Sequence, residues 1–253
     1  MSGSLAVVGL GPGDAALLTE SARRALDAAE DVVGYFPYVA RVPERPGLVR
    51  HASDNRVEVD RARHALQLAA SGRRVAVVSG GDPGVFAMAA AVFEAVEQGE
   101  PDWRDLAITV EPGVTAMLAA AARLGAPLGG DFCALSLSDN LKPWPVVTAR
   151  LEAVLRADFV IALYNPISAA RPWQLGAALE IASGIRAPHT PVMFARAISR
   201  PDEAIRVATL AEARDVPADM ATMVILGAST TRLIPRAGRT PFVYTARKVE
   251  EPA

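Results

Sequence analysis

The sequence is poor in cysteine and lysine. Its 253 residues include one cysteine, Cys133, and two lysines, Lys142 and Lys248. A single cysteine excludes an intrachain disulfide framework and is typical of the reducing cytoplasm. No apolar run approaches the roughly 18 residues that span a bilayer; the longest, Val85–Phe93, has nine. Because Met1–Leu10 also lacks the basic start and long apolar core of a signal peptide, we expect a cytoplasmic protein and neither a membrane nor a secreted one.

An excess of charge of one sign is also absent. The chain has 26 basic and 28 acidic residues, a formal net charge of −2, so no basic field favours nucleic acid as a partner. Most basic residues are arginines, which bind carboxylates well, although genome composition also produces arginine-rich chains. Apolar residues at 51% and charged residues at 21% indicate a folded globular protein and exclude disorder.

Several well-known site motifs are missing. Residues 9–14 read GLGPGD after an apolar run, but the dinucleotide fingerprint requires glycine where Asp14 stands and an acid where Gly34 and Tyr35 stand. The chain contains no G-x-x-x-x-G-K-[ST] and no G-x-S-x-G. Its three histidines have no metal-ligand spacing with one another or with Cys133. The sequence therefore predicts no bound metal, and Cys133 is expected in the core.

The first half of the chain alternates short apolar runs with amphipathic segments. Thr19 can cap one helix, and Gly72 can end another as its C′ residue. Strands are predicted at Leu5–Gly9, Asp31–Tyr35, Arg74–Ser79 and Ala107–Glu111, and helices at Glu20–Ala29, Asp60–Ser71, Phe86–Glu97 and Thr115–Leu124. This alternation implies a mostly parallel sheet with helices on both faces.

A Gly/Pro-rich break at Gly125–Asp131 is the best domain boundary, and alternation resumes after it. We expect two α/β domains, 1–126 and 127–253, with a ligand cleft between them. In the second half the predicted strands are Phe132–Leu137, Phe159–Leu163, Pro191–Phe194, Ala204–Thr209, Thr222–Leu226 and a terminal edge strand Pro241–Tyr244, with helices at Trp144–Arg156 and Trp173–Ser183.

Glycine-rich turns follow two successive strands of the first half. Residues 79–86 read SGGDPGVF and residues 111–116 read EPGVTA. Glycine lets a ligand approach the backbone, and Asp82 can accept hydrogen bonds from ligand hydroxyl or amino groups. The alternative is a turn whose Asp82 caps the next helix. Since loops at the carboxyl ends of strands form the binding crevice of open α/β sheets, two such turns favour one shared site.

Two polar loops follow strands of the second half. Residues 137–144 read LSDNLKPW and concentrate Ser138, Asp139 and Lys142; residues 164–171 read YNPISAAR. The alternative for Asp139 is an ordinary cap of the helix that Pro143 begins.

These motifs resemble those of the tetrapyrrole (cobalamin-pathway) methyltransferase family. GLGPGD, SGGDPGVF, EPGVTA, LSDNLKPW, YNPISAAR and TMVILGAS occur in the family's order and nearly its spacing, from Leu5 to about Tyr244. Within the family, LSD-x-L-x-PW and YNP-x-S-x-x-R resemble the branch that methylates C17 of precorrin-3B and contracts the ring, giving precorrin-4. One departure is Ala228, where this branch usually has asparagine.

The resemblance implies S-adenosylmethionine as methyl donor, S-adenosylhomocysteine as its product, a tetrapyrrole substrate and a homodimer. The positions that match the family's cofactor contacts are Pro12, Gly80, Gly81, Asp82, Val85, Phe86, Thr115, Ala116, Tyr164, Asn165 and Ala197. The tetrapyrrole is expected near GLGPGD, Tyr35–Tyr38 and the LSDNLKPW loop, with its carboxylates on Arg171, Arg196 and Lys142.

Methyl transfer from a sulfonium mainly requires alignment of the donor with the accepting carbon. Ring contraction additionally moves a proton, which a positioned acid or base assists. Asp139 is the candidate for this role, with Ser138 and Lys142 orienting groups around it. The alternatives are another precorrin or uroporphyrinogen C-methyltransferase of the same family, and a non-catalytic relative that only binds the ligand.

Overall fold

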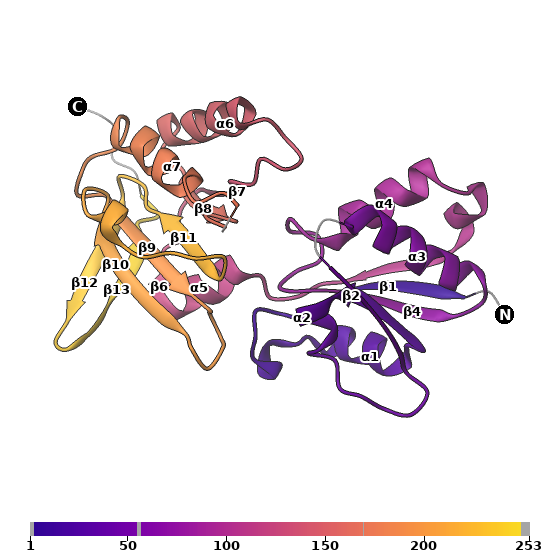
Figure 1. Ribbon diagram of the computed structural model, residues 1–253. Coiled ribbons are helices and arrows are strands. Elements are labelled where there is room, and N and C mark those ends of the chain that lie inside the picture. The colour runs from indigo at the N-terminus through magenta and orange to yellow at the C-terminus, as the bar shows by residue number, and fades with distance from the viewer. Residues whose placement is uncertain (1–2, 55–56, 169, 249–253) are drawn as a thin grey trace. The chain divides into compact units, whose positions relative to one another are not determined.

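The computed structural model describes residues 3–54, 57–168 and 170–248. The chain divides into two compact units, Met1–Thr115 and Ala116–Ala253, whose elements are labelled in Figure 1. This division falls before the predicted boundary at 126/127. Helix α5 (Ala116–Leu124) packs on strands of the second unit, and β6 (Gly125–Ala126) pairs with one of them. The Gly/Pro-rich break at Gly125–Asp131 therefore lies after the boundary between the two units, inside the second one.

The first unit contains a five-stranded sheet in the order β3-β2-β4-β1-β5, and every neighbouring pair is parallel. Its elements are β1 (Ser4–Gly9), α1 (Glu20–Ala28), β2 (Asp31–Tyr35), α2 (Phe36–Val39), β3 (Val49–Ser53), α3 (Glu58–Ala70), β4 (Arg74–Ser79), α4 (Met88–Gln98) and β5 (Ala107–Glu111). The predicted parallel sheet is confirmed. Two elements were not predicted: β3, a short polar edge strand (VRHAS), and α2, a single turn.

Alternation of side chains along the strands produces two cores in this unit. Leu5 and Val7 of β1 pack with α3 and α4, whereas Val8 of the same strand packs with α1 and α2. Figure 1 shows these helix pairs on opposite faces of the sheet. Thr19 caps α1 as predicted, since its Oγ accepts from the Ala22 amide at 3.2 Å. Helix coverage of both faces explains why the strands are nearly continuous apolar runs.

Helix α4 begins two residues later than predicted. Phe86 has φ of +52°, a left-handed conformation that a right-handed helix excludes. The helix consequently starts at Met88, whose amide donates to Ser79 Oγ at 3.3 Å. This leaves the SGGDPGVF segment as an open loop after β4.

The second unit has a mixed five-stranded sheet in the order β10-β9-β11-β8-β7. Its elements are β7 (Phe132–Ser136), α6 (Trp144–Arg156), β8 (Val160–Tyr164), α7 (Gln174–Ser183), β9 (Pro191–Arg196), β10 (Ala204–Thr209) and β11 (Thr222–Leu226). Only β7 and β8 pair in parallel; β9, β10 and β11 form antiparallel pairs. No long helix separates β9, β10 and β11, and parallel neighbours require such a crossover. The core lies between this sheet, α6 and α7.

A small second sheet of this unit has the order β12-β13-β6. β12 (Thr231–Arg236) and β13 (Arg239–Thr245) form an antiparallel hairpin, and β13 pairs with β6 on its other side. The strand predicted at Pro241–Tyr244 lies within β13, but the prediction that it is an edge strand is wrong, because β13 is the central strand of this sheet. β12 was missed since its arginines and proline give it no apolar run.

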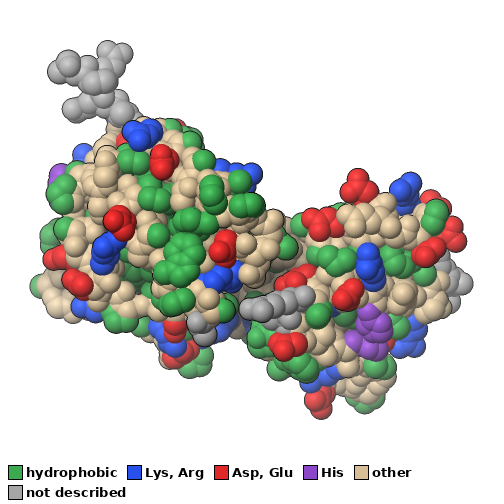
Figure 2. Space-filling model, turned by 45° about the horizontal axis from the view of Figure 1, so that its top comes forward, with side chains coloured by type: hydrophobic (Ala, Val, Ile, Leu, Met, Phe, Trp, Pro, Cys, Tyr) green, Lys and Arg blue, Asp and Glu red, His purple; other side chains and the backbone are tan. Residues whose placement is uncertain are grey.

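The surface mixes charges of both signs. On the face shown in Figure 2, blue basic and red acidic side chains are interspersed over both units, as the small net charge suggests. Cys133 is partly buried and packs against the core of the second unit, and burial raises the pKa of its thiol to about 11. The expectation of a core cysteine is confirmed. No helix within the described ranges has the length and apolarity needed to cross a bilayer.

Candidate functional site

Three loops of the first unit meet at the carboxyl ends of neighbouring strands β4, β1 and β5. Gly11 and Gly81 exchange backbone hydrogen bonds of 3.1 and 2.9 Å. A Cβ atom on Gly113 would lie 2.2 Å from the Gly81 carbonyl oxygen, and one on Gly9 would lie 2.7 Å from it. Only glycine permits this approach. The GLGPGD, SGGDPGVF and EPGVTA loops thus pack backbone against backbone.

The Asp82 carboxylate connects two of these loops by hydrogen bonds. Its Oδ1 accepts from the Gly84 amide at 2.8 Å, and its Oδ2 accepts from the Gly113 amide at 3.0 Å. Helix α4 has no side-chain cap, so the interpretation of Asp82 as a helix cap is wrong. A carboxylate has about four acceptor positions, so Asp82 keeps capacity for a further donor.

Two further residues shape this edge and were not predicted in detail. Arg41 donates to the carbonyl oxygens of Leu10 at 2.6 Å and Gly11 at 3.1 Å, and these hydrogen bonds hold the GLGPGD loop in place. Tyr38 lies against Gly80, where a Cβ atom would be 2.7 Å from its ring. Nothing in the spacing of Arg41 signals its role, because its acceptors are backbone atoms thirty residues away.

Backbone strain marks three of the predicted cofactor positions. Five described non-glycine residues have positive φ, and Phe86, Asn165 and Ala197 are among them, at +52°, +51° and +47°. Such a conformation costs about 1–3 kcal/mol and persists where the surroundings enforce it, often at ligand sites. Phe86 is also half exposed.

In the second unit, the loops after β7 and β8 are joined by side chains. The buried Ser136 Oγ accepts from the Asn165 side-chain amide at 3.0 Å and from the Ser138 amide at 3.3 Å. Tyr164 Oη accepts from the Met117 amide at 3.3 Å, which connects the end of β8 to the start of α5 beside Ala116. The Leu137 amide donates to the Tyr164 carbonyl at 2.9 Å. Tyr164, Asn165 and Ala116 are therefore grouped by the fold.

Asp139 belongs to a cluster that links the two branch motifs. Its Oδ1 accepts from Arg171 at 3.2 Å and from the side-chain amide of Gln174 at 3.2 Å. Arg171 also donates to Ser138 Oγ at 3.0 Å. Helix α6 begins without a side-chain cap, so the capping alternative for Asp139 is wrong. Within the described residues Oδ2 of Asp139 accepts no hydrogen bond.

The predicted carboxylate-binding cations differ in their surroundings. Arg171 pairs with Asp139, while Arg196 pairs with Asp219 at 2.7 Å and with Asp202 at 2.8 Å. These bonds, that to Asp219 first, raise the pKa of Arg196. Lys142 has no ion pair with a described carboxylate, and burial together with the charge of Arg150 lowers the pKa of its ammonium group. Of these three cations, Lys142 is therefore the one that no described carboxylate neutralises.

The structure assembles the predicted positions within each unit. Pro12, Gly80, Gly81, Asp82, Val85 and Phe86 lie on adjoining loops, and Thr115 follows the β5 loop. Tyr164 ends β8, and Asn165 and Ala197 directly follow β8 and β9, so the three lie at one edge of the second sheet. Ala169 of the YNPISAAR motif is outside the described residues. Ser136 and Gln174 were missed, since each looks like an ordinary strand or helix residue in the sequence.

Comparison with known proteins gives consistent matches over nearly the whole chain. The family model of tetrapyrrole (corrin/porphyrin) methylases matches residues 4–214. The chain is 57% identical over 247 residues to the precorrin-3B C(17)-methyltransferase of Sinorhizobium sp, covering 98% of this chain and 97% of that protein. The crystal structure of the methyltransferase CobJ matches with a TM-score of 0.90 and 52% identity, covering 97% of this chain and all of that one. Uroporphyrin-III C-methyl transferase from Thermus thermophilus, complexed with S-adenyl homocysteine, matches with a TM-score of 0.67 and 26% identity over 89% of this chain and 97% of that chain.

Proposed function

The chain belongs to the tetrapyrrole (corrin/porphyrin) methylase family, and we propose that it is the S-adenosylmethionine-dependent enzyme that methylates C17 of precorrin-3B in cobalamin biosynthesis. The observation that carries this proposal is the 57% identity to a precorrin-3B C(17)-methyltransferase across almost both full lengths. The Ser138–Asp139–Arg171 cluster, which joins the LSDNLKPW and YNPISAAR motifs, adds support.

The loops of the first unit fit a ligand such as S-adenosylmethionine. Glycines 9 and 113 let these loops pack backbone against backbone, and Asp82 retains acceptor capacity toward hydroxyl or amino groups. We propose that these loops hold the methyl donor together with Phe86, Thr115, Tyr164, Asn165 and Ala197. When bound, the sulfonium supplies an activated methyl group. The protein's own contribution is to orient donor and acceptor carbon.

For ring contraction, Asp139 is the proposed acid or base. The hydroxyl at the bridging carbon has to lose a proton while the neighbouring carbon migrates and a lactone opens. Arg171 and Gln174 fix one carboxylate oxygen of Asp139 and leave the other available, which positions it for proton transfer. Ser138 is held by Arg171 and acts as an orienting group, and Lys142 takes a peripheral carboxylate of the substrate.

The direct test is incubation of the pure protein with methyl-labelled S-adenosylmethionine and precorrin-3B. We expect one labelled methyl group at C17 and a product with the mass and absorbance of precorrin-4. Uroporphyrinogen III and other precorrins serve as comparison substrates. Transfer to one of these instead of precorrin-3B would overturn the pathway position, and tight donor binding without transfer to any of them would favour the non-catalytic alternative.

The family resemblance alone supports a homodimer, and the single cysteine supports a cytoplasmic location. Light scattering at micromolar concentration should then give about twice the chain mass of 26.6 kDa. A mass near that of one chain would contradict the dimer without affecting the proposed reaction.

A further inference from the structure

The hydroxyl of Thr19 links the start of α1 to the EPGVTA loop. Its Oγ accepts from the Ala22 amide at 3.2 Å, which caps the helix, and it donates to the Pro112 carbonyl oxygen at 2.9 Å. Thr19 and Pro112 are 93 residues apart in the chain. Capping requires only an acceptor. The hydrogen bond to Pro112 is therefore a second role of this side chain, beyond the cap.

The direction of both hydrogen bonds follows from the partners of Thr19. A backbone amide can only donate and a carbonyl oxygen can only accept, so the single hydroxyl proton of Thr19 goes to Pro112. The Ser21 hydroxyl, 3.3 Å away, can then approach Thr19 only as a donor. Thr19 is thus an acceptor toward the helix and a donor toward the loop, and substitution can separate these two roles.

The peptide group between Pro112 and Gly113 is held from both sides. Its carbonyl oxygen accepts from Thr19 at 2.9 Å, and its N–H donates to Asp82 Oδ2 at 3.0 Å. Because a peptide group is planar, two hydrogen bonds on its opposite sides fix the orientation of the whole plane. On Gly113 a Cβ atom would lie 2.2 Å from the Gly81 carbonyl oxygen, so this plane also sets how the EPGVTA and SGGDPGVF loops meet.

We infer that Thr19 is a positioning residue for the methyl donor and strengthens donor binding by holding the EPGVTA loop. The inference rests on the proposed function, in which this loop and its neighbours bind S-adenosylmethionine. Thr19 acts through the Pro112–Gly113 peptide group and needs no contact with the donor itself. Without its hydrogen bond, the loop is less well ordered before binding, and the cost of ordering it reduces the affinity.

Three substitutions separate the two roles of the hydroxyl. Thr19→Ser keeps the acceptor and the donor. Thr19→Asp keeps an acceptor for the helix amide, since aspartate is a strong N-cap, but a carboxylate has no proton for the Pro112 carbonyl oxygen. Thr19→Val has nearly the shape of threonine and loses both hydrogen bonds. The comparison of Thr19→Ser with Thr19→Asp therefore isolates the contact with the loop.

Titration calorimetry of the full chain with S-adenosylhomocysteine measures the affinity. We expect Thr19→Ser to bind within about twofold of wild type, and Thr19→Asp and Thr19→Val to bind about tenfold more weakly, which is equivalent to about 1.4 kcal/mol. Melting curves should place Thr19→Val about 2–4 °C below Thr19→Asp, because only valine also removes the cap. Stability and affinity should thus rank the variants differently.

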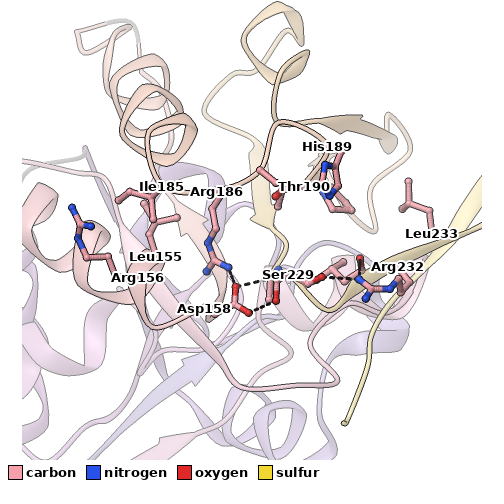
Figure 3. A pocket seen from close by; sticks show the side chains of 14 residues that line it. Leu155, Arg156, Asp158, Ile185, Arg186, His189, Thr190, Ser229, Arg232 and Leu233 are labelled. Atoms are coloured by element: carbon pink, nitrogen blue, oxygen red, sulfur yellow. Dashed lines mark hydrogen bonds and ion pairs between the residues drawn. The ribbon is translucent and has the colours of Figure 1, made fainter. Parts of the chain in front are cut away.

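Ser229→Ala is the matched control in the second unit. The Ser229 hydroxyl also connects two distant segments, since it donates to Asp158 Oδ2 at 2.5 Å. Figure 3 shows this pair beside Arg186 in a pocket next to the starts of β8 and β9, whereas Tyr164 and Ala197 lie at the other ends of these strands. Ser229→Ala should lower the melting temperature and change the affinity by less than about twofold.

Hydrogen exchange of the ligand-free protein gives a readout that does not depend on the donor. The Gly113 amide should exchange faster in Thr19→Asp than in wild type and Thr19→Ser, because the loop opens more often. Wild-type affinity or unchanged Gly113 exchange in a folded Thr19→Asp protein would overturn the inference and leave the proposed function intact.

Two further outcomes would contradict the inference. An equal loss of affinity in Ser229→Ala would show that donor binding follows general stability and not the contact between Thr19 and the loop. A wild-type protein that does not bind S-adenosylhomocysteine would overturn the proposed donor site, and the inference with it.

Discussion

The two units build their functional loops in different ways. In the first unit, glycine backbones of three loops touch, and a single carboxylate, Asp82, joins two of them. In the second unit, the loops after β7 and β8 are joined by side chains, those of Ser136, Asp139 and Arg171. The first arrangement depends on the absence of side chains, and the second on their chemistry.

This difference suggests a division of labour. A surface of backbone amides and carbonyls without Cβ atoms allows close binding of a ligand, whereas a network of hydroxyl, carboxylate and guanidinium groups can move protons and bind anions. We therefore expect substitutions in the first unit to affect donor affinity, and substitutions in the second to affect the chemical step.

Gly113→Ala is expected to have a large effect on donor binding. Its new Cβ atom would lie 2.2 Å from the Gly81 carbonyl oxygen, so the EPGVTA and SGGDPGVF loops must separate. We expect the affinity for S-adenosylhomocysteine, measured by calorimetry, to fall by about a hundredfold, equivalent to about 2.7 kcal/mol. Gly176→Ala is the control, because a Cβ atom there meets nothing within 4 Å. Unchanged affinity in a folded Gly113→Ala protein would contradict the proposal that the close packing of these glycine loops is needed for donor binding.

Asp139→Asn tests the second unit. It keeps the shape of the side chain but removes its charge and its capacity as a base, so formation of the ring-contracted product should slow by about 10²–10⁴-fold. Affinity for S-adenosylhomocysteine should remain near wild type. Asp215→Asn, an exposed residue outside the cluster, should leave both quantities unchanged. Wild-type turnover by Asp139→Asn, followed by mass spectrometry, would assign the proton step to another group.

Asp31→Asn tests what stabilises the fold of the first unit, at a residue outside its functional loops. Asp31 is 2% exposed and accepts from Arg73 at 2.6 Å and His51 at 2.7 Å. Burial raises the pKa of Asp31, but these partners hold it below its ordinary value. We expect urea unfolding at pH 7 to show a loss of about 2–3 kcal/mol.

The expected pH dependence of this loss follows from the lowered pKa. The contribution of Asp31 is present above the unfolded pKa of about 3.9 and disappears as pH falls through the lower folded value. The gap between wild type and variant should therefore close in acid. Asp60→Asn, an exposed residue of α3, should cost little at any pH, and a pH-independent gap for Asp31→Asn would contradict the ion-pair explanation.

The smallest expected effect is at Cys133 in the second unit. Since burial raises the pKa of its thiol to about 11, little thiolate forms at pH 8, and only the thiolate reacts readily. Alkylation by iodoacetamide should be much slower in the native protein than in urea. Equal rates would show that the start of β7 is open to solvent.

Local patterns predicted most of the elements. The bounds of β1, β2, β4, β5 and β11 were predicted to within one residue, because a buried strand is a short run of apolar residues. The polar edge strand β3 and the arginine-containing β12 have no such pattern and were missed. The grouping of glycine turns at one edge was also predictable, since parallel strands end on the same side. The hydrogen-bond partners of Asp82 and Asp139 were not, because Gly113 and Arg171 lie more than thirty residues away in the chain.

The sequence by itself determined where strands, helices and glycine turns lie, because burial and backbone conformation depend on residues close together in the chain. Only the tertiary structure decided that β9, β10 and β11 pair antiparallel, that α5 belongs to the second unit, and that Arg186 is buried beside Asp158. Strand direction, unit membership and charge pairing all depend on which distant segments meet. Those encounters follow from the packing of the whole unit, and no local periodicity encodes them.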